Sequence, residues 1–172
     1  MPGMKIISAT PGDAPVLARL NRFVHDPHAE HRPDIYRANP PLEELAPGFA
    51  EQLGRESVRA FIAELPGDQI DRPDQTGGED HAVGYAMANI VRRAENPLMH
   101  AESIIFLEHL AVDPAAVRRG VATALLEAVA AAGREAGCRR LVTDVWDFNE
   151  EARAFYRTAG FAPMRRLLDR PL

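Results

Sequence analysis

The pattern of apolar and polar positions predicts a chain in which short strands alternate with amphipathic helices. Apolar residues recur at helical spacing in four segments, each of which begins or ends beside a capping residue or a glycine. The helices are expected over 13–25, 42–54, 119–136 and 150–158. Four prolines predict an irregular connection over 26–41, because proline removes a backbone donor from a helix or strand.

Six apolar runs bounded by turn-forming residues predict strands. They cover 5–9, 58–65, 81–91, 103–112, 140–146 and 161–168. The run at 103–112 is the most apolar, as expected for a central strand that is covered on both faces. Segment 66–80 is rich in proline, glycine and acidic residues and has little to bury, so we expect a mobile loop there.

This order of elements predicts a single domain over residues 1–172, close to the usual ~150 residues of one domain. We expect an α/β (α+β) fold with a mixed, mostly antiparallel central sheet. About six or seven strands form the sheet, and about four helices flank it on both faces.

Composition and charge restrict the classes of function. The formal net charge of −5 and the isoelectric point near 5.7 argue against a protein that covers nucleic-acid phosphates. The single cysteine, Cys138, excludes an intrachain disulfide and an all-cysteine zinc site. No apolar run reaches the ~18 residues of a membrane span, and residues 1–9 lack the layout of a signal peptide. We therefore expect a cytoplasmic protein that binds neither membrane nor nucleic acid.

Segment 112–126 predicts an anion site. A strand ends there, a basic turn follows, and a helix begins at Gly120. The first N–H groups of a helix have no partner within the helix, and the helix dipole is positive at that end. Small residues would let a phosphate approach these groups, while Arg118 and Arg119 add positive charge. The alternative is a solvated arginine pair in front of an ordinary helix.

A second informative segment covers 147–161. Asn149 is a capping residue for the helix that follows it, and Gly160 can end that helix. Two interpretations of Tyr156 remain open from the sequence. It is either a buried structural tyrosine whose hydroxyl is hydrogen-bonded, or a phenol with a functional role.

These two segments together resemble the GNAT superfamily of acetyl-CoA-dependent N-acetyltransferases. The resemblance rests on a glycine turn that opens a helix, then a strand, then Asn-x-x-Ala-x-x-Phe-Tyr-x-x-x-Gly-Phe over 149–161, with the core motifs spanning 103–161. It implies a GNAT-like acyl-CoA N-acyltransferase fold, acetyl-CoA as co-substrate and no metal. The family loop that carries the donor's pyrophosphate falls on 117–122. There, Val117 stands where Gln or Arg is usual, and Arg118 stands where glycine is common.

The resemblance also implies roles for individual residues. Asn149 matches the family asparagine near the pantetheine arm, and Tyr156 matches the usual general acid. The main-chain N–H of Ala111 or Val112 would polarise the thioester carbonyl. The residues expected to bind acetyl-CoA are Leu110, Ala111, Val112, Val117, Arg118, Arg119, Gly120, Val121, Ala122, Thr123, Asn149 and Tyr156.

Glu108 is the candidate general base. A charged residue inside the most apolar strand is costly unless it faces a cleft, and partial burial raises the pKa of a carboxyl. The alternative is a solvated glutamate at an edge. Strand alternation predicts that His109 points to the opposite face and is a packed histidine.

The acceptor is expected to be a primary amine of a small molecule or a peptide. Segment 26–37 either forms a lid over the acceptor or is a simple connector, and Trp146 either lines the acceptor pocket or packs in the core. The residues expected to bind the acceptor are His31, Tyr36, Glu108 and Trp146. His25 and His28 complete an evenly spaced histidine series with His31, but a proline-broken loop is a poor frame for a metal site.

Two functions remain open from the sequence. One is an enzyme that transfers the acetyl group directly to the amine in a ternary complex, since Cys138 lies at the wrong end of its strand to be a nucleophile. The other is a non-catalytic acyl-CoA-binding sensor or interaction module of the same fold. A homodimer through the last strand is common among similar proteins and also remains open.

Overall fold

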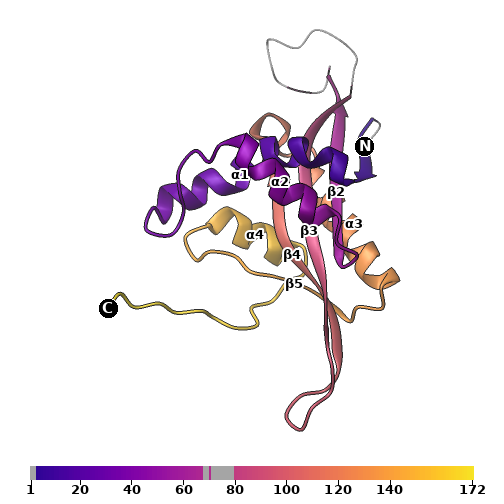
Figure 1. Cartoon of the computed structure of the whole chain (residues 1–172), viewed down its shortest axis with the longest axis vertical. Coiled ribbons are helices and arrows are strands. Elements are labelled where there is room, and N and C mark those ends of the chain that lie inside the picture. The colour runs from indigo at the N-terminus through magenta and orange to yellow at the C-terminus, as the bar shows by residue number, and fades with distance from the viewer. Residues whose placement is uncertain (1–2, 68–69, 71–79) are drawn as a thin grey trace.

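The computed structural model describes residues 3–67, 70 and 80–172. Within these residues, five strands and four α-helices form one open sheet with helices on both faces (Figure 1). The elements are β1 (Lys5–Ser8), α1 (Ala14–His31), α2 (Leu42–Leu53), β2 (Val58–Pro66), β3 (Asp80–Arg93), β4 (Glu102–Val112), α3 (Val121–Glu135), β5 (Arg140–Thr143) and α4 (Glu150–Thr158).

The strands follow the order β1-β2-β3-β4-β5 across the sheet. Strands β1 to β4 form three antiparallel pairs, and β5 is parallel to β4. A parallel pair needs a crossover connection, which α3 provides between β4 and β5. The mixed, mostly antiparallel sheet is therefore confirmed, and β3 and β4 project beyond it as a long hairpin (Figure 1).

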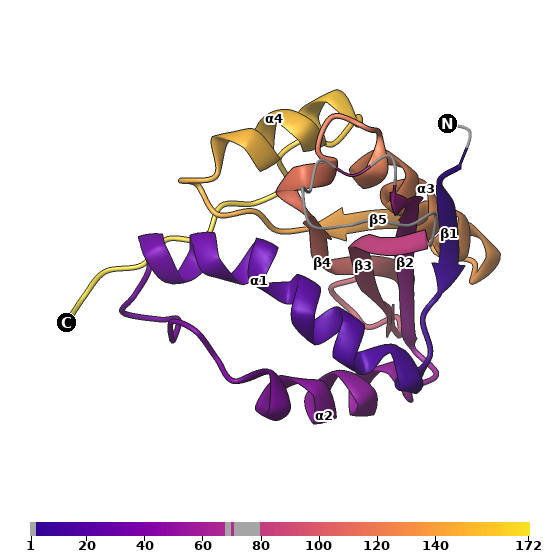
Figure 2. The same cartoon turned by 90° about the horizontal axis from the view of Figure 1, so that it is seen from above.

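Two apolar layers fix the helices against the sheet. Helices α1 and α2 cover one face, and α3 and α4 lie on the other (Figure 2). Under α3, Leu125 and Val129 pack with Ile105 and Leu107 of β4, and all four are at most 1% exposed. The α1 side has its own buried cluster, which includes Leu17. Helices on both faces are thus confirmed.

The contact between α3 and β4 has no room for an extra methyl group at Gly133. A Cβ there would lie 2.6 Å from Cγ2 of Ile105, which is 1% exposed and cannot move aside. We expect Gly133→Ala to lower the free energy of unfolding by about 1–2 kcal/mol in urea titrations, because overpacking outweighs the gain in helix propensity. The matched control is Gly48→Ala in α2, where no atom lies within 4 Å of the added carbon. This control should gain about 0.5–1 kcal/mol, and a gain in both variants would contradict the packing argument.

Helix α1 is longer than its sequence predicts. It continues through Pro27 to His31, so the irregular connection expected from residue 26 is wrong for its first six positions. Pro27 has no N–H to give to the preceding turn, but the last turn still closes with Arg32 N–H donating to His28 O at 2.8 Å. Ala29 is buried, and this packing offsets the missing hydrogen bond.

The strand expected over 161–168 is absent from the described structure, so the sheet has five strands. Strand β5 ends at Thr143 and offers only four residues to a further strand. Leu167 and Leu168 are 94% and 82% exposed, so ordering this segment would bury little apolar surface. The described residues therefore contain no strand after β5 through which two copies could pair. Most of the loop expected over 66–80 lies outside the described residues.

Candidate active site

A β-bulge in β4 changes which side chains share a face of the sheet. Met87 pairs with His109 and Ala88 pairs with Leu107, so Glu108 has no partner in the ladder. A bulge of one residue cancels one step of strand alternation. Leu107 faces the α3 side, and Glu108 and His109 both follow on the α1–α2 side. The prediction that His109 points away from Glu108 is therefore wrong.

The Glu108 carboxylate has the electrostatics of a base held at a partly covered surface. Glu108 is an exposed residue, although part of its carboxyl group is covered. Burial raises the pKa of Glu108 above its ordinary value, while the positive charge of Arg55, just beyond α2, acts to lower it. A raised pKa makes this carboxylate a better proton acceptor than a fully solvated one.

His109 is held by a buried polar chain. Its Nδ1 lies 3.0 Å from Oη of Tyr85, which accepts a hydrogen bond from Nδ2 of Asn21 at 2.8 Å. Its ring also meets the ring of Phe49 edge-on at 5.9 Å. Burial lowers the pKa of His109 to about 4, so the ring is neutral at neutral pH. Sequence reasoning missed this chain because its members lie 64 and 24 residues apart.

Strand β5 pairs with only the first part of β4. The parallel ladder joins Ile104–Leu107 to 140–143, where the Thr143 hydroxyl donates to Leu107 O at 3.0 Å. Strand β4 then continues to Val112, but β5 has ended. Within the described chain, no strand pairs with this edge of β4 from Glu108 onward, so its main-chain groups are free to meet a ligand.

Tyr156 on α4 lies beside the point where the two strands part. The Thr143 side chain lies close enough to the phenol to act on its pKa, and the Tyr156 ring lies 5.3 Å from that of Phe155 and 5.2 Å from that of Phe161. Burial raises the pKa of the phenol, and the negative charge of Asp144 raises it further. The phenol therefore keeps its proton at neutral pH and can donate it.

The loop before α3 has the backbone of an anion site. Arg118 and Gly120 both have left-handed backbone angles, with φ of 62° and 78°. Gly120 is the N-cap of α3 and supplies no side-chain cap. Gly120 therefore offers no side-chain acceptor to the first N–H groups of α3, which lie at the positive end of the helix dipole. The left-handed angle also explains why glycine is common at the position of Arg118.

These features fit the donor expected from the sequence. Uncapped N–H groups and two arginines suit the pyrophosphate of a coenzyme A thioester, and the free edge of β4 suits its amide-rich arm. Acetyl-CoA would supply an acetyl group activated as a thioester.

Removing the two arginines should weaken donor binding in a salt-dependent way. Arg118→Gly keeps the left-handed backbone, and Arg119→Ala removes the second charge. We expect this double variant to raise the Kd for acetyl-CoA about tenfold at low salt and less at high salt, as measured by calorimetric titration. Arg134→Ala, in the last turn of α3, is the matched control and should leave the Kd unchanged. An unaltered Kd in the double variant at both salt concentrations would remove the arginines from the site.

Asn149 caps α4, as predicted. Its side chain accepts a hydrogen bond from the N–H of Ala152 at 3.0 Å, and the acidic first turn and the left-handed Gly160 mark the two ends of the helix. Its place beside the pantetheine arm stays a prediction.

An aromatic cluster joins the end of α1 to the segment between β5 and α4. Its members are His28, His31, Tyr36, Trp146 and Phe148. His31 stacks on Phe148 at 4.3 Å, and Trp146 Nε1–H donates to Tyr36 Oη at 3.2 Å. The structure therefore brings together His31, Tyr36 and Trp146, three of the four residues expected to bind the acceptor. Among the described residues, the fourth, Glu108, makes no ring contact or hydrogen bond with them, and Arg55 is the charged residue that acts on it.

Sequence reasoning missed the centre of this cluster. The ring of His28 lies 5.3 Å from that of Tyr36 and 6.3 Å from that of Trp146. An irregular chain was expected at this point, whereas α1 presents His28 and His31 on consecutive turns. Arg32 then covers Trp146 at 5.3 Å and forms an ion pair with Asp169.

The histidines of α1 are engaged in other contacts. His25 Nε2 lies 2.7 Å from Arg37 O, and His31 Nδ1 lies 2.9 Å from Pro27 O. In the part of the chain that the structure describes, no group of three or more His, Cys, Asp or Glu side chains could hold a metal ion.

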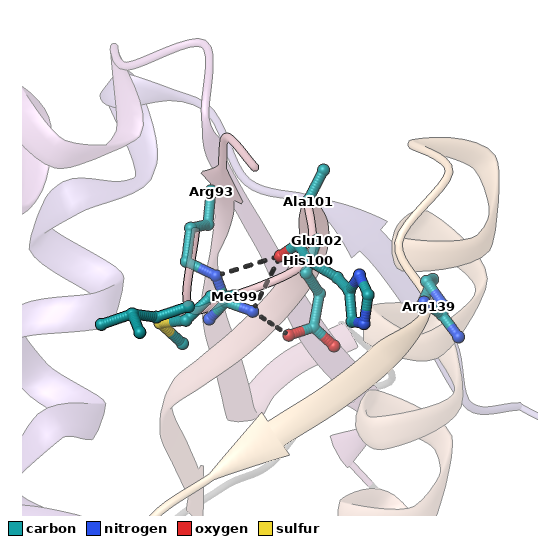
Figure 3. A pocket seen from close by; sticks show the side chains of 7 residues that line it. Arg93, Met99, His100, Ala101, Glu102 and Arg139 are labelled. Atoms are coloured by element: carbon teal, nitrogen blue, oxygen red, sulfur yellow. Dashed lines mark hydrogen bonds and ion pairs between the residues drawn. The ribbon is translucent and has the colours of Figure 1, made fainter. Parts of the chain in front are cut away.

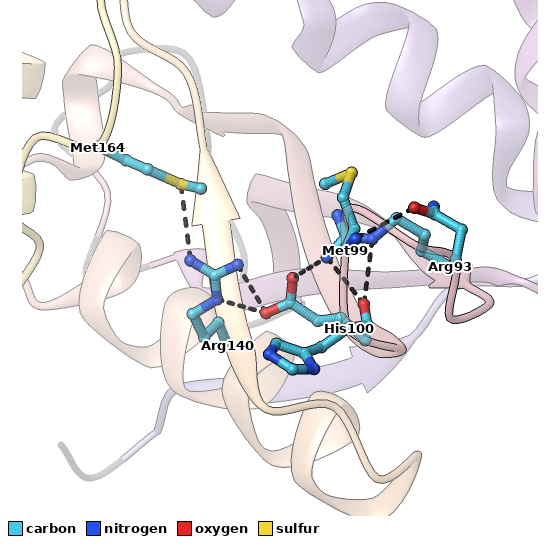
Figure 4. Close-up of polar contacts among 7 residues, drawn as sticks. Arg93, Met99, His100, Arg140 and Met164 are labelled. Carbon is cyan, nitrogen blue, oxygen red and sulfur yellow. Dashed lines mark hydrogen bonds and ion pairs between the residues drawn. The ribbon is translucent and has the colours of Figure 1, made fainter.

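A hollow of about 290 Å³ lies at the turn that joins β3 to β4 (Figure 3). Glu102 is held there between Arg140 at 2.6 Å and Arg93 at 3.1 Å, and these two arginines keep the pKa of Glu102 below its usual value. Figure 4 labels both arginines. This hollow is at the opposite end of β4 from the anion loop. We therefore assign it no part in the reaction.

None of the described helices is both long enough and apolar enough to cross a membrane.

Comparisons with known proteins show the family of the chain. The chain matches the Acetyltransferase (GNAT) family over residues 30–161. It is 31% identical over 163 residues to an aminoglycoside N(6')-acetyltransferase type 1 of Stenotrophomonas maltophilia, which covers 95% of this chain and 89% of the relative. A Salmonella enteritidis protein of the same name is 28% identical over 151 residues, covering 86% of this chain and 94% of the relative.

Solved structures share the fold. A tetramutant of the BH1408 protein from Bacillus halodurans matches with a TM-score of 0.82 and 24% identity, over 98% of this chain and 99% of that one. The aminoglycoside N-acetyltransferase AAC(6')-Iy in complex with CoA matches with a TM-score of 0.72 and 22% identity, over 98% of this chain and 94% of that one. The resemblance drawn from the sequence motifs is confirmed: the chain belongs to the GNAT family and is an acetyl-CoA-dependent N-acetyltransferase.

Proposed function

We propose that the protein transfers an acetyl group from acetyl-CoA directly to a primary amine of a small cationic molecule, within a ternary complex. One observation carries this proposal. Glu108 follows Leu107 at the point where β4 and β5 part, and Thr143, which bonds Leu107 O there, lies near Tyr156. This nearness to the free edge of β4 supports Glu108 as the base and Tyr156 as the acid.

Glu108 takes the proton that prevents the amine from attacking. An alkylamine with a pKa of ~10.4 is unprotonated in only about one molecule in a few thousand at pH 7. The partly covered Glu108 carboxylate attracts the ammonium group and accepts its proton, directly or through one water.

Tyr156 supplies the second proton. Negative charge develops on the departing sulfur as its bond to the acetyl carbon breaks, and a phenol beside it can donate a proton at that step, although the thiol's pKa of ~8.5 lies below that of the phenol. The raised pKa of Tyr156 keeps this phenol protonated until that step. Neither proton transfer is needed by a module that only binds acyl-CoA, which favours the enzyme over the binding module.

The acceptor class is proposed from charge and from the relatives. The chain carries a net charge of −5, which favours a cationic partner. Two relatives are named as acting on aminoglycosides, which are small molecules with several amines. We therefore place an aminoglycoside amine first among acceptors, ahead of a peptide amine.

Initial-rate measurements of thiol release test this proposal. Acetyl-CoA and each acceptor are varied together, with an aminoglycoside, a simple polyamine and a lysine peptide as acceptors. Direct transfer predicts intersecting double-reciprocal lines and the highest kcat/KM for the aminoglycoside. Parallel lines would indicate an acetyl-enzyme instead, and a preference for the peptide would overturn the proposed acceptor class.

A further inference from the structure

The hydrogen-bonded chain Asn21–Tyr85–His109 connects the middle of α1 to the bulge in β4. Asn21 is 8% exposed and Tyr85 is 0% exposed. The two hydrogen bonds measure 2.8 Å and 3.0 Å, which is within the range of well-formed bonds. Polar groups buried this deeply are costly unless each is paired, so the chain fixes its members in one arrangement.

The direction of these bonds determines where the proton of His109 lies. The amide nitrogen of Asn21 can only donate, so Tyr85 Oη accepts from it. The single hydroxyl hydrogen of Tyr85 then has Nδ1 of His109 as its acceptor. A neutral imidazole whose Nδ1 accepts a hydrogen bond carries its hydrogen on Nε2.

His109 lies on the same face of the sheet as Glu108. The bulge places the residue next to Glu108, on the face covered by α1 and α2. A positive charge on His28 would lower the pKa of His109, so the ring also lies near the aromatic cluster. Among the described residues, Nε2 has no hydrogen-bond partner, although Nδ1 has one.

We propose that the Asn21–Tyr85–His109 chain holds His109 as the Nε2–H tautomer, and that this N–H donates a hydrogen bond to an uncharged oxygen of the acceptor beside its reacting amine. The proposal rests on the proposed function and adds an acceptor requirement to it. A neutral donor suits this place, because a charged imidazolium would repel the ammonium group that Glu108 attracts. His109 is thus a specificity residue that favours hydroxylated amines over their deoxy counterparts.

The tautomer is tested without substrate. Long-range ¹H–¹⁵N correlation spectra of histidine-labelled protein give the protonation state of each ring nitrogen, and His109→Gln identifies the His109 signals by their loss. At neutral pH we expect an Nε2–H ring whose Nδ1 accepts a hydrogen bond. Tyr85→Phe should move the Nδ1 signal to that of a nitrogen without a hydrogen bond. An Nδ1–H ring or an imidazolium in the wild-type protein would overturn the proposal.

The acceptor contact is tested by binding as well as by turnover. Calorimetric titration in the presence of CoA compares an aminoglycoside with its analogue lacking the hydroxyl beside the reacting amine. The wild-type protein should prefer the hydroxylated compound roughly three- to tenfold, the worth of one hydrogen bond. His109→Phe should abolish this preference. His109→Gln should keep much of it, because its amide nitrogen can donate from a similar place.

These outcomes separate the inference from the proposed function. A protein that acetylates none of the amines would refute the proposed function, while the spectra and the binding preference would still decide the role of His109. An equal preference in the wild-type protein and in His109→Phe would refute the acceptor contact even if turnover is normal. Retained affinity for acetyl-CoA in each variant shows that the fold is intact.

Discussion

Replacing Tyr156 with phenylalanine is expected to lower kcat by about a hundredfold or more, because a positioned general acid typically contributes at least that factor. The ring remains packed against Phe155 and Phe161, so the fold and the Kd for acetyl-CoA should stay close to those of the wild-type protein. Thiol release at saturating substrates gives kcat, and calorimetric titration gives the Kd. Equal kcat values in the two proteins would leave Tyr156 with a structural role only.

Replacing Glu108 with glutamine should lower kcat/KM by about a hundredfold and also change its pH dependence. Burial raises the pKa of Glu108, and only the deprotonated carboxylate can accept a proton. In the wild-type protein, kcat/KM should therefore fall as the pH drops through this raised pKa. The Glu108→Gln variant has no such group, so this acidic limb should disappear, while the rise due to the amine itself at higher pH persists.

Glu102→Gln is the matched control for that profile. Glu102 lies on the same strand, but it is paired with two arginines at the hairpin end and its pKa is lowered. This control should keep the acidic limb. A profile of Glu108→Gln that coincides with that of the wild-type protein would show that Glu108 is a solvated strand residue and not the base.

Local sequence signals predicted much of the fold and of the donor side of the site. Helices α3 and α4 have their apolar spacing and their flanking residues in consecutive positions. The expected range of α4 matches the structure, and α3 lies one or two residues inside the range expected for it. The anion loop was found in the same way, because it lies in one short segment that ends at Gly120. The structure adds the left-handed backbone angle of Arg118, which could not be predicted from an arginine at this position.

The acceptor side was harder to predict because it depends on contacts between distant segments. Pro27 signalled the end of a helix, yet tertiary packing of the turn around His28 carries α1 past it. The bulge at Glu108 has no sequence signature in an apolar strand, and it reversed the expected side of His109. Similarly, the run 161–168 has the composition of a strand but has no neighbouring edge long enough to pair with.

Calorimetric titration of the wild-type protein with acetyl-CoA, with ADP as the control, tests the central claim most directly. The claim is that the uncapped start of α3 and the free edge of β4 form one binding site for the donor. The account predicts one site per chain, with a Kd for acetyl-CoA in the micromolar range and weaker binding of ADP, which lacks the pantetheine arm. An absence of binding at millimolar acetyl-CoA would contradict the account and leave the site without its donor.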